Sequence, residues 1–192
     1  MRLLKSKVTL AVCVILLPLH VFAFGNHPKP DGMTFREAKL FLKQSVHQPG
    51  DRDEYCGCKI TASGKKWLVD WESCGYIPRK NAERASRIEW EHVVPASEFG
   101  QQRQCWQQGG RKNCSTNDAI FAAMEGDPHN LVPVVGEVNG DRGNLKYGML
   151  AREQGVGYGQ CPSRVDFKTN VFMPNPSFRG NAARTYFYFR QR

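Results

Sequence analysis

The chain has 192 residues and a formal net charge of +9, from 27 Lys and Arg against 18 Asp and Glu. Apolar residues make up 41% of the chain, which is enough for a hydrophobic core and excludes wholesale disorder. The 18 Gly and 11 Pro indicate many turns, so a purely helical bundle is disfavoured.

Residues 1–23 have the layout of a secretory signal peptide. Three basic residues precede an apolar run at 8–19, and Ala23 provides a small residue for cleavage. The run is shorter than the roughly 20 residues that span a bilayer, although an uncleaved anchor is the alternative. We therefore expect a periplasmic or secreted protein with a single domain over 24–192 and no membrane attachment after cleavage.

The expected mature chain keeps a basic balance. Cleavage removes Arg2, Lys5 and Lys7 but no acidic residue, so the formal charge falls from +9 to +6. A positive charge of this size is typical of proteins with polyanionic partners, although many solvated surfaces are also basic.

Apart from Cys13 in the leader, the chain has six cysteines, and an even number in an exported chain predicts disulfides. Cys105 and Cys114 would close a short polar loop and are the first expected pair. Neighbours as close as the first two cysteines do not easily bond each other, so each is expected to reach further, one of them to Cys74. A zinc site is the alternative, but no C-x-x-C pattern or nearby histidine supports it. The disulfide candidates are Cys56, Cys58, Cys74, Cys105, Cys114 and Cys161.

The N-terminal half of the expected domain begins with a helix. Thr34 and Glu37 match a capping box, and apolar residues follow at helical spacing, so the pattern predicts an amphipathic helix over 35–46. Alternation then predicts a strand at 66–71. Next come one helical turn at 82–86, a β-branched and aromatic strand at 88–94, and a polar, glutamine-rich stretch at 101–113.

The C-terminal half mixes the same kinds of element. Capping residues predict a helix over 117–125, and apolar residues predict a strand at 131–135. A further helix is expected to begin within 135–141, and an aromatic helix over 179–191. The mixture favours an α+β fold.

The most informative stretch contains Glu91 and His92. Adjacent residues of a strand point to opposite faces, but a bulge or the strand end near Pro95 could bring both into one pocket. A carboxylate can hold a hard divalent cation, and a neutral imidazole can accept a proton from an attacking water. Taken alone, the pair favours a surface glutamate and a half-buried histidine.

The wider context changes that interpretation, because four ordered segments resemble the bacterial endonuclease I family over roughly 34–190. These segments are RIEWEHVVPASEFG at 87–100, GDPHNLVPVVGEVNGDRGN at 126–144, CPSRVDFK at 161–168 and RGNAARTYFYF at 179–189. The family consists of periplasmic or secreted endonucleases with little sequence preference. The resemblance implies a ββα-metal (His-Me finger) motif within a disulfide-bonded α+β fold, and relatives that continue further at the C-terminus, so this chain is expected to be C-terminally shortened.

The resemblance also implies a set of site residues. His92 would be the general base, Glu91 and Asn139 would bind one divalent ion, Arg111 would hold the scissile phosphate, and Glu125 would be a supporting acidic residue. The expected ion is Mg²⁺, with Mn²⁺ or Ca²⁺ able to replace it for binding. His129 is expected to have a structural role.

The resemblance further implies that a monomer hydrolyses DNA, and also RNA, and leaves 5′-phosphates. Sequence-independent phosphate contacts would come from basic side chains. One alternative is a basic module that binds nucleic acid without cutting it, and another is a metallohydrolase for a different substrate. The candidates for phosphate contact are Arg79, Lys80, Arg84, Arg103, Lys112 and Arg142.

Overall fold

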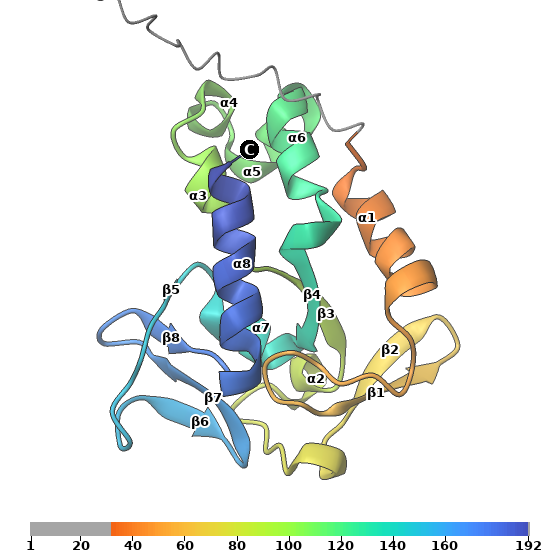
Figure 1. Ribbon diagram of the computed structural model, residues 1–192, viewed down its shortest axis with the longest axis vertical. Coiled ribbons are helices and arrows are strands. Elements are labelled where there is room, and N and C mark those ends of the chain that lie inside the picture. The colour runs from red at the N-terminus through yellow and green to blue at the C-terminus, as the bar shows by residue number, and fades with distance from the viewer. Residues whose placement is uncertain (1–31, 192) are drawn as a thin grey trace, which may run out of the picture.

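A computed structural model describes residues 32–191, so the predicted signal peptide lies outside it. Three small sheets and eight helices within this part form a mixed α+β fold (Figure 1). Two of the sheets have two strands each, and the third has four in the order β5-β8-β7-β6. None of the helices in the described part is long and apolar enough to cross a membrane.

A unit of two strands and a helix lies at the centre of the fold. β3 (Ile88–His92) pairs antiparallel with β4 (Leu131–Val135), and α7 (Gly136–Arg142) follows β4 directly and packs against both strands. Gly136, the first residue of α7, permits a close approach to the segment just before β3, because a Cβ added there would lie 2.5 Å from the Arg84 carbonyl oxygen. The last residue of β3, His92, therefore lies at the edge of a small helix-backed sheet.

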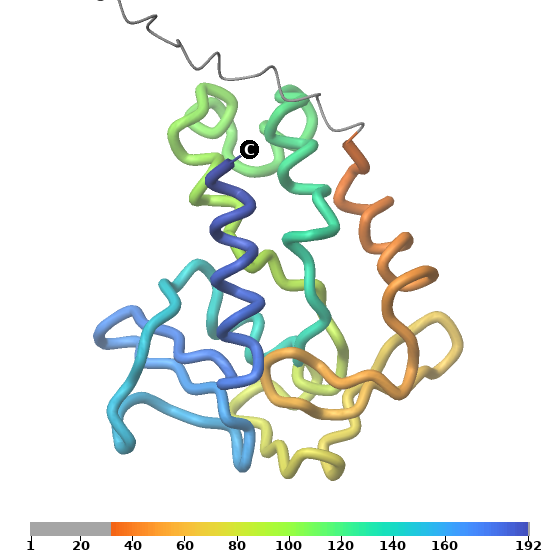
Figure 2. Tube along the Cα trace, in the orientation of Figure 1, coloured from red at the N-terminus to blue at the C-terminus, as the bar shows by residue number. Residues whose placement is uncertain are grey.

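The connection from β3 to β4 is a helical subdomain rather than a tight turn. It contains α3 (Ala96–Gly100), α4 (Gln104–Gln107), α5 (Gly110–Asn117) and α6 (Ala119–Glu125). These helices share a core that includes Phe99 and Phe121 and lie together at one end of the molecule (Figure 2). The connection brings Arg111 and Glu125 back towards the end of β3.

The N-terminal region covers one side of the central unit. α1 (Phe35–Phe41) continues to Val46 through a π-helical turn, and its capping box is formed as predicted. β1 (Lys59–Ser63) and β2 (Lys66–Asp70) form a hairpin, and α2 (Ala82–Ala85) follows it. The helix at 35–46 and the strand at 66–71 were thus predicted within a residue, whereas β1 was missed.

The C-terminal region forms the four-stranded sheet and a long helix. Its strands are β5 (Lys146–Tyr147), β6 (Val156–Tyr158), β7 (Cys161–Asp166) and β8 (Val171–Met173). α8 (Arg179–Arg190) crosses from this sheet towards α3 (Figure 1). The helix was predicted, but the sheet was not, because three of its four strands have only two or three residues.

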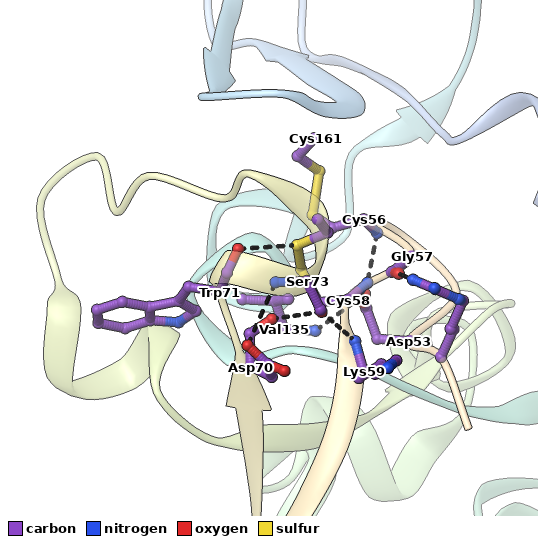
Figure 3. Close-up of a disulfide and its surroundings, with 12 residues drawn as sticks. Asp53, Cys56, Gly57, Cys58, Lys59, Asp70, Trp71, Ser73, Val135 and Cys161 are labelled. Atoms are coloured by element: carbon purple, nitrogen blue, oxygen red, sulfur yellow. Dashed lines mark hydrogen bonds between the residues drawn. A yellow bond between two sulfur atoms is a disulfide. The ribbon is translucent and has the colours of Figure 1, made fainter. Parts of the chain in front are cut away.

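Three disulfides connect the six cysteines. The Cys105–Cys114 bridge confirms the first expected pair, and Cys58 bonds Cys74. The third bridge joins Cys56 to Cys161, 105 residues further along the chain (Figure 3). Asp53 organises the loop that carries Cys56 and Cys58, because its buried carboxylate accepts hydrogen bonds from the amides of Tyr55, Cys56 and Cys58. The predicted disulfide framework is therefore present.

Loss of the Cys56–Cys161 bridge is expected to destabilise the fold more than loss of Cys105–Cys114. In the chain-entropy account, a bridge that closes a loop of about 100 residues contributes on the order of 4.7 kcal/mol, and a short loop contributes less. Urea unfolding of the Cys56→Ser/Cys161→Ser and Cys105→Ser/Cys114→Ser double variants measures the difference. Equal losses from the two variants would contradict this ranking.

Candidate active site

A cleft of about 510 Å³ lies where β3 ends against α7, α3 and α5. Glu91, His92, Arg111 and Asn139 all line it, although they are spread over 49 residues of sequence. Glu91 and His92 share the cleft because His92 is the final residue of β3, where the alternation of the strand ends. This is the strand-end arrangement that the sequence left open.

Glu91 is a buried carboxylate held by two donors. The Tyr55 hydroxyl donates to Glu91 Oε1 at 2.6 Å, and Arg142 Nη1 donates to the same oxygen at 2.7 Å. Burial raises the pKa of Glu91, while the Arg142 charge and the Tyr55 hydrogen bond oppose that shift. Since both side chains contact Oε1, Oε2 is the oxygen that remains for a ligand in the cleft.

Asn139 is oriented by a second glutamate of β3. Its Nδ2 donates to Glu89 Oε2 at 2.8 Å, so the carbonyl oxygen Oδ1 is the end of the amide left for the cleft. Glu89 is itself bound by Arg84 and Arg87. Burial would raise the pKa of Glu89, but the hydrogen bonds from Arg84, Asn139 and Arg87 together hold it below its usual range. Glu89 therefore acts as an ionised acceptor.

The pairing of α7 with β3 has a simple geometric basis. Residues two apart on a strand share a face, and residues three apart on a helix share a side. Asn139 and Arg142 accordingly contact Glu89 and Glu91. One helical turn thus positions both oxygen donors of the cleft.

His92 is held in one tautomer by the backbone. Its Nε2 lies 2.8 Å from the Glu125 carbonyl oxygen, which can only accept, so Nε2 carries the proton and Nδ1 is left as a base. Burial lowers the pKa of His92 to about 4, so the ring is neutral at pH 7. The Phe35 ring packs 4.7 Å from the imidazole, centroid to centroid. The arrangement provides an oriented proton acceptor.

Arg111 and Glu125 form an ion pair beside His92. Arg111 Nε lies 2.5 Å from Glu125 Oε1, and the Ser115 hydroxyl donates to the other carboxylate oxygen. The Arg111 side chain is 45% exposed and lines the cleft. Glu125 therefore positions two neighbours, His92 through its carbonyl and Arg111 through its carboxylate.

The donor set suits a hard divalent cation. Glu91 and Asn139 offer a carboxylate and an amide oxygen, the ligand types that Mg²⁺ and Ca²⁺ prefer. The six cysteines outside the leader are in disulfides, and no group of three or more His, Cys, Asp or Glu side chains within residues 32–191 could hold a metal. These observations disfavour a zinc site and are compatible with an ion bound by two protein ligands.

Sequence comparison agrees with the resemblance of the four segments. The profile of the family named Endonuclease I matches residues 34–192. The chain belongs to the endonuclease I family. It is 55% identical over 159 residues to an extracellular deoxyribonuclease of Aeromonas hydrophila, which covers 82% of this chain and 68% of the relative. It is 54% identical to a periplasmic deoxyribonuclease of the same species, over 82% and 66% of the two chains. Endonuclease-1 of Buchnera aphidicola is 46% identical, over 82% and 62%.

Membership of the endonuclease I family confirms several predictions at the level of the family. The chain is an endonuclease, an enzyme of the phosphodiester hydrolase class. The periplasmic or extracellular location expected from the leader agrees with the names of the relatives and with the three disulfides. The chain spans about two thirds of the length of these relatives.

The basic residues predicted to contact phosphates occupy different environments in this endonuclease. Arg84 lines the cleft, and Lys80 and Lys112 are exposed. Arg79 and Arg103 are each 24% exposed and pair with Asp141 and Asp118.

The prediction for Arg142 is wrong. Its side chain is fully buried, and it donates to Glu91 and to the carbonyl oxygens of His92 and Val93. Arg142 therefore cannot contact a phosphate and instead fixes the end of β3.

Several residues that shape the endonuclease site were not predicted. Glu89 could have been found, because it lies two residues from Glu91 on the same strand face. Tyr55 carried no sequence signal, since it reaches Glu91 from a loop 36 residues away. Asn130 clamps the backbone of Val94 with two hydrogen bonds and so fixes the chain just after His92.

Proposed function

We propose that this chain is an exported endonuclease that hydrolyses DNA with a single bound Mg²⁺, His92 acting as general base. The observation that carries the proposal is the shared cleft, in which two oxygen donors, an oriented neutral imidazole and an exposed arginine meet. The β3–β4–α7 unit, which carries Glu91, His92 and Asn139, has the strand–strand–helix order of a ββα-metal motif. A basic module that only bound DNA would have no need for this set.

His92 Nδ1 takes the proton from the attacking water. The water oxygen bonds to phosphorus as the P–O3′ bond breaks, and the departing O3′ takes up a proton from solvent, so the products carry a 5′-phosphate and a 3′-hydroxyl. General base catalysis of this kind contributes about 10²- to 10⁴-fold. The Nε2 hydrogen bond to the Glu125 carbonyl keeps the ring in the required tautomer.

Glu91 and Asn139 would hold the metal through Oε2 and Oδ1. The bound ion would supply Lewis-acid stabilisation of charge on the departing oxygen, worth several kcal/mol. Mn²⁺ and Ca²⁺ are expected to bind the same two ligands, because both ions accept oxygen donors.

Arg111 holds the scissile phosphate. A guanidinium can form two parallel, charge-assisted hydrogen bonds to phosphate oxygens, and Arg111 Nε is already oriented by Glu125. The Arg111 charge stays on the exposed side of the cleft, where a phosphate can enter. Glu125 is thus a positioning residue rather than a ligand.

Contacts of this kind address the phosphate backbone rather than the bases, so little sequence preference is expected. The relatives named deoxyribonucleases support DNA as the substrate. We expect RNA to be cut as well, since none of the proposed contacts depends on the sugar, and we expect the monomer to be active.

The metal requirement is tested by digesting supercoiled plasmid with the purified chain. Digestion is expected with Mg²⁺ and complete protection with EDTA, because Glu91 and Asn139 alone cannot stabilise the departing oxygen. Restoring Mg²⁺ should restore cutting, and end-labelling should find 5′-phosphates. A chain that shifts DNA in a gel but leaves it intact with every divalent ion would instead be a non-catalytic binding module.

A further inference from the structure

A second hollow, of about 820 Å³, adjoins the catalytic cleft. Its walls come from α3, the segment around β5 and the part of α8 from Arg179 to Tyr186. In Figure 1, α8 runs up towards α3. Ser97 and Asn144 line both the cleft and this groove. A nucleic-acid strand bound at the catalytic cleft can therefore continue into the groove without leaving the protein surface.

The groove holds two cations with no carboxylate partner. Lys146 is exposed, and neither Lys146 nor Arg179 forms an ion pair with any residue of the described part. Arg179 donates through Nε to the Pro174 carbonyl, so its two terminal nitrogens are left for another acceptor.

The contrast with the catalytic cleft is clear, because there Arg84 is paired with Glu89 and Arg111 with Glu125. The acidic residue of the groove is Glu98, whose carboxylate accepts a hydrogen bond from Tyr186. Lys146 and Arg179 thus leave the groove with a net positive charge.

Apolar surface lies between these charges. Met149 is 68% exposed, and Ala183 and Pro174 extend the same apolar wall. Alternating positive charge and apolar surface fits a nucleotide strand, whose phosphates need cations and whose sugars and bases need apolar contact.

We propose that this groove is a binding site for the nucleotides that flank the scissile phosphate on one side, with Lys146 and Arg179 contacting their phosphates. The inference rests on the proposed nuclease function and extends it from the reacting bond to the adjacent strand. Binding here is sequence-independent, because the groove offers charges and apolar contact rather than a pattern of donors and acceptors for base edges.

The test measures binding of a fluorescent single-stranded 12-nucleotide DNA to the chain carrying His92→Ala, over a range of salt concentrations. Adding Lys146→Ala and Arg179→Ala is expected to weaken the Kd by about tenfold, as for two screened charge contacts. The slope of log K against log salt should fall by about 0.7 for each lost phosphate contact. Ala183→Glu, which adds a negative charge to the wall and removes nothing, should weaken binding in the same direction.

The matched control is Lys59→Ala with Lys168→Ala, which removes two exposed lysines that line neither hollow. Equal losses from the two double variants would show that only net charge matters and would overturn the inference, as would an unchanged salt slope. Plasmid digestion by the otherwise unaltered chain tests the proposed function separately. If that chain cuts DNA while the groove variants bind normally, the inference alone fails.

Discussion

His92→Ala is expected to lower the kcat for DNA cleavage by about 10²- to 10⁴-fold while DNA affinity changes little. The imidazole Nδ1 is the proposed proton acceptor, and the Glu125 carbonyl holds the other nitrogen. Alanine removes the acceptor but leaves the oxygen donors and Arg111 in place. Single-turnover cleavage and gel-shift titration with the same oligonucleotide separate the chemical step from binding.

His129 provides the matched control for that experiment. It lies outside the cleft, its side chain is 71% exposed, and it contacts Asp127 and the Tyr188 ring. Because His129 lies outside the cleft, His129→Ala should retain nearly full activity. Near wild-type cutting by His92→Ala, or an equal loss in His129→Ala, would mean that His92 is not the base.

The second large effect is expected for Arg142→Met, which should lower the free energy of unfolding by about 3–5 kcal/mol. Removing one partner of a buried ion pair leaves an uncompensated charge, here that of Glu91. Two backbone carbonyls would also lose their donor. Urea unfolding measures the stability, and calorimetric titration with Mg²⁺ should show weaker binding, because Glu91 Oε1 then keeps only the hydrogen bond from Tyr55.

Two further variants make the Arg142 experiment decisive. Arg152→Met is the control, since the Arg152 side chain is 97% exposed and should cost less than about 1 kcal/mol. Adding Glu91→Gln to Arg142→Met should recover part of the lost stability, because the unpaired charge is then gone. A loss from Arg142→Met no larger than that from Arg152→Met would contradict a supporting role for the buried pair.

Much of the fold was predictable where local pattern determines structure. The capping box at Thr34 marked the start of α1, and apolar runs marked β3 and β4. The polar segment 101–113 was assigned no helix or strand from its sequence, yet α4 and the first half of α5 lie within it. The Cys105–Cys114 bridge and packing on Phe121 hold these short helices, and neither is a local signal.

The main residues of the candidate site could be predicted from the sequence, but the residues that hold them in place could not. The family motifs pointed to Glu91, His92 and Asn139, which do share one cleft. Arg142 was misjudged because a charged residue at a helix end is usually exposed, and only the fold reveals that it faces β3. Tyr55 could not be paired with Glu91 from sequence, since a loop of no regular pattern carries it there.

The Cys56–Cys161 bridge has a consequence for where the enzyme can work. Cys56 follows Tyr55 directly, so formation of this one disulfide anchors Tyr55, whose hydroxyl donates a hydrogen bond to Glu91. In a reducing cytosol this bridge is not expected to form, so Tyr55 would lose its covalent anchor and would hold Glu91 less firmly. A freshly made chain would thus spare the chromosome of the cell that produces it and become dangerous to nucleic acid only after passing outside.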